Sequence, residues 1–367
     1  MANITNAMSL SLPTISYCIV PKNATISITI PQPPEIQVII WQYIAGTFCL
    51  FGGSTNLVLI IIILRSPQLH RGAGILVSHL LACHVAYFAV LQPFAIARII
   101  AVTHLPRITE LDCEFCRFQH LIIMSCVFLV GWTEALLACN RIVGVFFPIK
   151  YRLFDRPLVH GCSLTLGWLL TLSLTLPPVF NYHASFKMGP VGNCFYVPES
   201  AIAVSWLSFN VYCPLAIATA SSVLISVKFA LSHVTGRQQV HPPPHAARAN
   251  NADRMGPRVP SQSGMSRKQA RMSRMLITSF LVNFVCQLPQ FLFAATGMTS
   301  RYPLLSLWAV CCMMLQCSCA PVTFLTLNSD YRKQFAELLP SFLRHRMAGH
   351  NLQQPPSGTS TNRRPIE

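Results

Sequence analysis

Seven long apolar runs constrain this chain more than any other feature of its sequence. A helix that crosses the hydrocarbon core of a bilayer needs about 20 predominantly apolar residues. Only 10% of the 367 residues are Asp, Glu, Lys or Arg, against roughly a quarter in a soluble domain. The sequence therefore predicts an all-α membrane protein, a bundle of seven transmembrane helices. The runs cover residues 38–64, 74–97, 118–147, 162–180, 201–227, 275–298 and 303–327.

The formal net charge of +16 restricts the choice of partners. A basic balance can indicate nucleic-acid binding. Here the basic residues lie between the apolar runs, and no nucleic-acid-binding motif accompanies them. We therefore expect membrane lipids and a cytosolic protein as partners, and no nucleic acid.

The positions of Lys and Arg predict an orientation in the membrane. Short cytoplasmic loops carry an excess of these residues. Most of the 27 Lys and Arg fall on the cytosolic side if the N-terminus lies outside. Two glycosylation sequons, at Asn3 and Asn23, then lie in the outer segment 1–37. We expect a multi-pass plasma-membrane protein with an extracellular N-terminus.

Four of the 15 cysteines lie outside the apolar runs, on the expected outer side. They are Cys18, Cys113, Cys116 and Cys194. An even number of cysteines in an oxidising space suggests two disulfides. Four cysteines allow three connectivities, and the spacing alone leaves all three open.

Short motifs follow one another along the runs in a fixed order, and together they resemble the rhodopsin-like (class A) G-protein-coupled receptors. The resemblance covers about residues 38–339, and the chain resembles a divergent member. The motifs are Gly53-Ser54-Thr55-Asn56, Cys116, Asn140-Arg141-Ile142 followed by Pro148 and Tyr151, Trp168 with Pro177-Pro178, Pro214, Cys286-Gln287-Leu288-Pro289 and Ala320-Pro321-Val322-Thr323-Phe324.

The resemblance implies a division of the chain. A seven-transmembrane domain would cover residues 38–328, and a short amphipathic eighth helix would cover 329–346. A disordered cytoplasmic tail would follow at 347–367. The third inner loop, about 230–266, is rich in Pro, Ser, Gly and Arg and is expected to be disordered.

The resemblance also assigns roles to motif residues. It implies a disulfide between Cys116 and Cys194, which leaves Cys18 and Cys113 as a second pair. Kinks are expected at Pro214, Pro289 and Pro321, because proline removes a helical hydrogen bond, and Phe324 belongs to the same switch region. The residues expected to contact a G protein are Asn140, Arg141, Ile142 and Pro148. The alternative is that Arg141 only anchors the helix end by snorkelling.

A ligand pocket is expected, by resemblance, between the outer halves of the helices. Ile123 stands where amine receptors carry an Asp, so a biogenic amine is not expected. Met314 stands where opsins carry the retinal-linking Lys. The expected ligand is therefore a peptide or a neutral small molecule. The alternative for each lining residue is that it only packs between helices. The expected lining is Gln119, His120, Ile123, Met124, Trp206, Asn210, Gln287, Gln290, Phe291, Ser306, Val310 and Met314.

Several residues depart from the family pattern inside the membrane. His84, Val130 and Ala320 replace residues that help to hold a sodium ion, so we expect no regulation by sodium and no metal. The expected polar cluster consists of Asn56, His84, Glu134 and Asn283. A contact between His84 and Glu134 is one hypothesis for this cluster. The alternative is a protonated Glu134 bonded to backbone or water.

A receptor is the function that these features favour. It would transduce an extracellular non-amine ligand to heterotrimeric G proteins, with arrestin and receptor kinases as further partners. The alternatives are a seven-span transporter or channel, and an arrestin-biased receptor with weak G-protein coupling. No nucleophile arrangement, HExxH motif or phosphate-binding glycine loop occurs, so we expect no enzyme and no cofactor.

Overall fold

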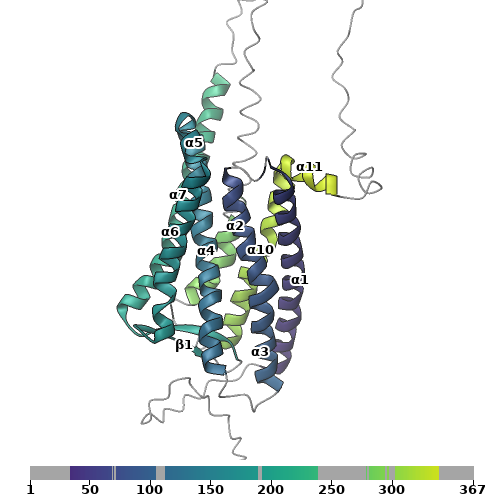
Figure 1. The fold of residues 1–367 in the computed structure, drawn as a ribbon, viewed down its shortest axis with the longest axis vertical. Coiled ribbons are helices and arrows are strands. Elements are labelled where there is room, and N and C mark those ends of the chain that lie inside the picture. Colours follow the sequence, from purple (N-terminus) through teal and green to yellow (C-terminus); the bar gives the residue numbers. More distant parts are fainter. Residues whose placement is uncertain are drawn as a thin grey trace, which may run out of the picture.

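The computed structural model describes residues 34–67, 69, 72–104, 112–188, 192–238, 278, 281–293, 296 and 302–338. Long helices run side by side along one axis (Figure 1). Within the described residues, six helical segments are long and apolar enough to cross a membrane, and a shorter apolar helix, Leu281–Phe293, lies in the expected run 275–298. Together they form the predicted seven-helix bundle.

The elements follow the predicted runs and in places exceed them. The helices are α1 (Glu35–Arg65), α2 (Ala73–Ala86), α3 (Gln92–His104), α4 (Asp112–Phe146), α5 (Pro148–Phe154), α6 (Pro157–Thr175), α7 (Ala201–Gln238), α10 (Pro303–Leu327) and α11 (Ser329–Leu338). A 3₁₀ turn, Pro177–Phe180, follows α6, and strands β1 (Ala184–Met188) and β2 (Cys194–Pro198) form an antiparallel hairpin.

The second span is continuous from α2 to α3, through a π-helical turn at Tyr87–Leu91. Pro93 stands directly after this turn. Because proline has no N–H to give to the preceding turn, the helix widens locally instead of breaking. This widening lies beside the cavity described below.

The two ends of the bundle differ. The β1–β2 hairpin covers one end, called here the hairpin end, and α5 and α11 lie at the other (Figure 1). Two clusters of buried side chains fill the bundle. The first includes Trp41, Phe88 and Met314, and the second includes Leu59, Leu81 and Phe324. Many other apolar side chains are exposed on the outside of the bundle, where a bilayer would solvate them.

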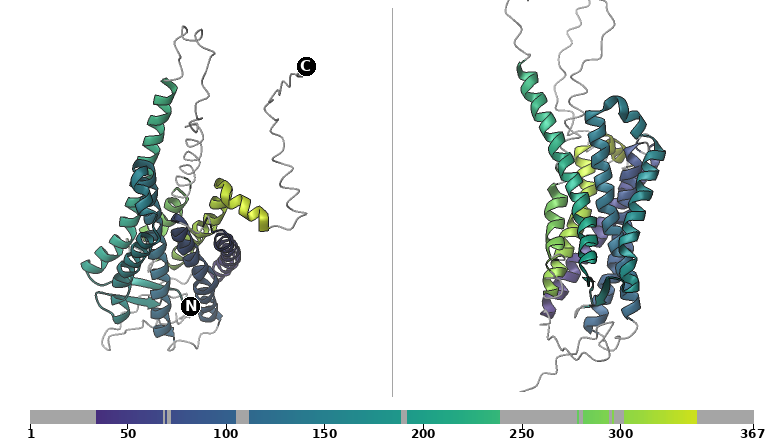
Figure 2. Two further views of the ribbon diagram at one scale, coloured as in Figure 1. Left: turned by 45° about the horizontal axis from the view of Figure 1, so that its top comes forward. Right: turned by 90° about the vertical axis from the view of Figure 1, so that its left-hand side faces the viewer.

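One helix end differs from the predicted division of the chain, and a second can be compared only over part of its length. The third loop was expected to be disordered from about residue 230, but α7 continues to Gln238, beyond the neighbouring helices (Figure 2). No proline interrupts the sequence between Pro214 and Pro242, so the backbone can extend the helix past the apolar run. Of the expected amphipathic helix 329–346, Ser329–Leu338 is helical, and the remainder lies outside the described residues.

Helix α11 leaves the bundle axis directly after α10 (Figure 1). The Asn328 side chain accepts a hydrogen bond from the Asp330 N–H at 3.0 Å and caps the new helix. Tyr331 is buried against Phe324, with ring centroids 5.9 Å apart. Burial raises the pKa of Tyr331 to about 12.

Candidate ligand cavity and intramembrane polar network

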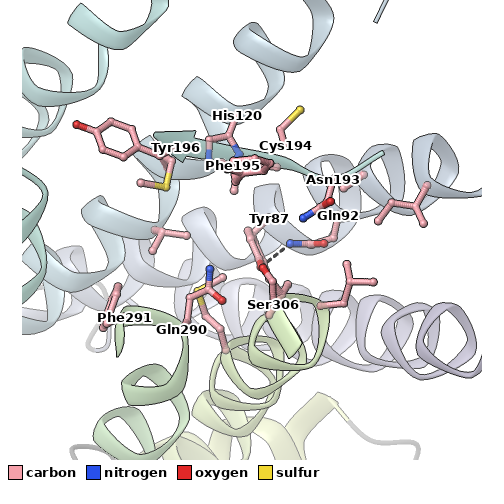
Figure 3. Close-up of a pocket in the computed structure, with 18 of the residues that line it drawn as sticks. Tyr87, Gln92, His120, Asn193, Cys194, Phe195, Tyr196, Gln290, Phe291 and Ser306 are labelled. Carbon is pink, nitrogen blue, oxygen red and sulfur yellow. Dashed lines mark hydrogen bonds between the residues drawn. The ribbon is translucent and has the colours of Figure 1, made fainter. Parts of the chain in front are cut away.

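A cavity of about 130 Å³ lies at the hairpin end. Its walls come from α1, α3, α4, α7, α10, the helix Leu281–Phe293, the π-helical turn and the hairpin (Figure 3). Most of the lining is apolar, and a few polar side chains face one another across it. This composition is typical of small-molecule sites.

The hairpin is tied to the bundle by a disulfide. Cys116 of α4 and Cys194 of β2 are bonded, with their Cα atoms 5.8 Å apart, so this predicted pair is confirmed. Phe186 of β1 is buried and packs against His120, with ring centroids 5.1 Å apart. Cys18 lies outside the described residues, as does the Cys113 side chain, and so do the sequons at Asn3 and Asn23.

The polar lining is partly engaged within the protein. Gln92 donates a hydrogen bond to the Tyr87 hydroxyl (Figure 3). Arg98 donates through Nε to the Gly192 carbonyl at 2.7 Å. The Tyr196 hydroxyl donates to the Ala203 carbonyl at 3.2 Å, and burial raises the pKa of this phenol to about 12.

Seven of the twelve expected ligand residues line this cavity, and whether they touch a ligand stays a prediction. They are His120, Ile123, Met124, Gln290, Phe291, Ser306 and Val310. The other five, Gln119, Trp206, Asn210, Gln287 and Met314, are not among the lining residues.

Each of those five has other neighbours. Asn210 accepts a hydrogen bond from Trp132 at 3.0 Å, and Gln119 donates to the Leu91 carbonyl at 3.4 Å. The Trp206 ring lies against His183, with centroids 5.9 Å apart. Met314 is fully buried in the first core cluster, and its neighbour Met313 lines the cavity instead. Gln287 belongs to the network below.

Sequence reasoning missed several lining residues, including Trp41, Tyr87, Gln92, Arg98, Asn193 and Tyr196. One signal was present in the sequence. Arg98 is a cation near the end of the second span, and ionisable residues in spanning helices mark functional sites by default. The hairpin residues carried no comparable signal, because the path of a loop depends on tertiary contacts.

A polar network lies deeper in the bundle and centres on Glu134 of α4. Its carboxyl group accepts hydrogen bonds from Asn283 Nδ2 and, at 3.2 Å, from Gln316 Nε2. Gln287 Nε2 donates to Gln316 Oε1 at 2.9 Å. The network therefore joins α4, α10 and the helix Leu281–Phe293.

The hypothesised contact between His84 and Glu134 does not form in this structure. His84 Nδ1 instead lies 3.1 Å from Asn56 Oδ1. Asn56 also donates to the backbone carbonyls of Gly52 and Cys317, at 2.7 and 3.2 Å. Amides from the facing helices satisfy Glu134, so the expected cluster is divided into two networks.

The residues expected to contact a G protein lie together at the end opposite the hairpin. Asn140, Arg141 and Ile142 are in the last turns of α4, and Pro148 begins α5. Asn140 is buried and Arg141 half-buried.

A cation from α7 reaches this end of α4. Lys228 donates to the Val145 carbonyl and lies 4.5 Å from the centre of the Phe146 ring. A cation is favourable at the C-terminus of a helix, where carbonyls lack intrahelical partners. Nearby, burial raises the pKa of Tyr151 in α5, and the negative charge of Asp155 raises it further.

Comparison with known proteins identifies the family. The family model described as 7 transmembrane receptor (rhodopsin family) matches residues 55–324. The chain belongs to this family. A search of the curated proteins finds no match. The rhodopsin-family assignment and the apolar helices make the chain a multi-pass membrane protein and a signalling receptor.

The expected kink residues lie within helices, Pro214 in α7 and Pro321 in α10, with Pro289 in Leu281–Phe293.

Proposed function

We propose that this receptor binds an extracellular non-amine ligand in the hairpin-end cavity and activates a heterotrimeric G protein at the opposite end. The cavity itself is the observation that carries the proposal. It is covered by a hairpin that a disulfide tethers, and it has the mixed apolar and amide lining of a ligand site.

The proposed orientation places the hairpin end outside the cell. Exposed cations gather at the other end, on α1, α5, α11 and the turn before α6. They are Arg65, Lys150, Arg156, Arg332 and Lys333. Cytoplasmic flanks of spanning helices favour such residues. An N-terminal epitope tag should therefore be labelled on intact cells, and Asn3→Gln with Asn23→Gln should abolish the mass shift on deglycosylation.

The lining favours a ligand other than an amine. Ile123 lies in the cavity wall, and no Asp or Glu is among the described residues that line the cavity. An ammonium group would therefore lose its hydration without gaining a carboxylate partner. A peptide end or a small molecule without a cation fits these walls.

The proposed effector site is centred on Arg141, flanked by Asn140, Ile142 and Pro148. Asn140 replaces the acid that the family resemblance leads us to expect before this arginine. The ionic restraint on the arginine is therefore missing, which favours either raised basal activity or altered coupling. Arrestin and receptor kinases are proposed as further partners at the same end.

The test is a ligand-library screen in cells with G-protein activation and arrestin recruitment read in parallel. The Arg141→Ala variant should lose G-protein activation at equal surface expression. The Arg65→Ala variant, which removes an exposed cation at the same end, should keep it. Unchanged activation in Arg141→Ala would contradict the proposed effector site. A ligand-gated ion or proton flux without transducer recruitment would favour the transporter or channel alternative.

A further inference from the structure

One permanent positive charge is buried in the wall of the cavity. Arg98 of α3 is 7% exposed and lines the cavity. A guanidinium stays protonated at any physiological pH. A cation within a spanning segment is costly to retain and is usually functional. The receptor therefore keeps a charge where apolar packing would cost less.

The hairpin holds this guanidinium in place. Arg98 Nε donates to the Gly192 carbonyl at 2.7 Å. Gly192 has a positive φ of 80°, and a Cβ there would lie 2.9 Å from Val102 Cγ2. Only glycine fits this backbone without strain. Gly192 is two residues from Cys194, whose disulfide fixes the hairpin to α4. The backbone of the hairpin therefore fixes the position of the Arg98 guanidinium, unlike that of an exposed cation.

The remaining polar lining consists of amides, hydroxyls and His120, with no carboxylate among the described residues. Asn193 and Gln290 approach the cavity from different sides, with Tyr87 and Ser306 between them (Figure 3). Amide N–H₂ and hydroxyl groups can donate hydrogen bonds. The same amides can accept through their oxygens, and those of Asn193 and Gln290 have no hydrogen-bond partner within the described part of the chain. No Asp or Glu is among the described lining residues, so no carboxylate there opposes a negative charge beside Arg98.

We propose that the ligand of this receptor carries a carboxylate that binds Arg98. This inference rests on the proposed function and deepens it, because it names the ligand class. Arg98 has five N–H groups in a planar fork, so it can hold Gly192 and other neighbours and still donate to a ligand. The Gly192 bond orients the fork, and guanidinium geometry matches a carboxylate.

The rest of the cavity defines the body of the ligand. Ile123, Val127, Phe291 and Val310 supply apolar walls, and the volume of about 130 Å³ suits a body of a few carbon atoms or one ring. Such a group is either a free organic acid or the C-terminal residue of a peptide. The two sources share the same chemistry at Arg98.

The experiment compares acids with their own primary amides on the purified full chain in nanodiscs, without a G protein. The probes are straight-chain acids from propanoate to decanoate, 4-phenylbutyrate, and the matched amides. The tripeptide Ala-Ala-Phe, as free acid and as C-terminal amide, forms the peptide arm. Binding is read as a shift of the thermal unfolding midpoint over a ligand titration. At least one acid should bind about tenfold or more tightly than its amide, and the arm that responds identifies the source.

Variants then locate the charge that is responsible. Arg98→Gln should abolish the preference for the acid, and Arg98→Lys should keep part of it. Arg117→Gln is the control, because this arginine lies at the same end but is not among the cavity-lining residues. If Arg98→Gln does not fold, Arg98→Lys and the acid–amide comparison on the native chain still decide the question.

Failure of the carboxylate inference can be distinguished from failure of the proposed function. Equal binding of acids and amides, no binding of any acid, or an unchanged preference in Arg98→Gln would overturn the carboxylate inference. Transducer activation by a neutral ligand could still hold in each case. Acid binding that depends on Arg98, without any transducer recruitment in cells, would support the inference and contradict the proposed function.

Discussion

Replacing Glu134 tests the network that joins α4, α10 and the helix Leu281–Phe293. Glu134→Leu removes the acceptor of two interhelical hydrogen bonds. The donors belong to Asn283 and Gln316, which are 6% and 3% exposed, so water cannot replace the lost acceptor. A buried donor without an acceptor costs about 1–3 kcal/mol, whereas interhelical hydrogen bonds in membranes average about 0.6 kcal/mol. For two bonds these figures give a loss in free energy of unfolding between about 1 kcal/mol, from the membrane average, and about 6 kcal/mol, from two unsatisfied donors.

Glu134→Gln should cost less than Glu134→Leu. The amide oxygen of the new side chain can accept one of the two bonds, but its N–H₂ group cannot accept the other. Rotation of the Gln316 amide would break the bond from Gln287. Rotation of the Asn283 amide would break no other bond, because its Oδ1 has no hydrogen-bond partner among the described residues, and it would let that oxygen accept from the new N–H₂ group. We expect a loss of no more than about 1 kcal/mol. The order Leu worse than Gln worse than Glu is specific to a hydrogen-bonded network.

The measurement is a double-mutant cycle of Glu134→Leu with Asn283→Leu. Steric trapping of the purified chain in bicelles yields the free energies, and Cys139→Ala, an exposed site on α4, serves as control. The double variant should lose less than the sum of the single variants, with a coupling of about 0.5–2 kcal/mol. Effects that add within about 0.5 kcal/mol would refute the reasoning, as would a neutral Glu134→Leu.

Three further predictions concern packing, the hairpin and α11. Gly52→Ala places a Cβ 2.6 Å from the Phe88 ring and should lower stability by about 1–3 kcal/mol. Gly46→Ala, with no atom within 4 Å, should be neutral or stabilising, and thermal midpoints compare the two. Cys194→Ser should cost about 2–4 kcal/mol by releasing the hairpin, seen as a lower midpoint and faster proteolysis there. Because the pKa of Tyr331 is raised to about 12, its neutral form stabilises the fold fully below the unfolded value of about 10. That contribution should fade between pH 10 and 12 and be missing in Tyr331→Phe, as followed by phenolate absorbance and the midpoint at each pH.

The spanning helices could be predicted because apolar length is a local property of the sequence. Their ends could not, because a helix continues through polar residues until its backbone is interrupted. Helix α4 begins at Asp112, before the predicted run 118–147, and α7 extends to Gln238. The π-helical turn before Pro93 was not predicted either. A proline in the sequence indicates a local disturbance of a helix but does not say which form the disturbance takes.

The side on which a residue faces depends on partners that sequence spacing does not reveal. Ile123 and Gln290 line the cavity, as expected from the resemblance. Asn210 and Gln287 were expected there for the same reason, but indole and amide groups of other helices engage them. His84 was expected to contact a polar side chain, and it does. The partner is Asn56 of α1 and not Glu134 of α4.

The cavity and the network are close enough to act on each other through shared walls. A second cavity, of about 10 Å³, is lined by His84 and Gln287 and shares Tyr87, Val127 and Met313 with the first. A ligand that displaces Met313 would therefore move this side chain into the second cavity, which Gln287 also lines. Gln287 in turn bonds Gln316, which bonds Glu134. Within the bilayer these amides find few substitute partners, so a shift of one favours a discrete rearrangement over gradual loosening. The double-mutant cycle measures the coupling of Glu134 to Asn283, and repeating it with a bound ligand would show whether occupation of the cavity changes the interactions of Glu134.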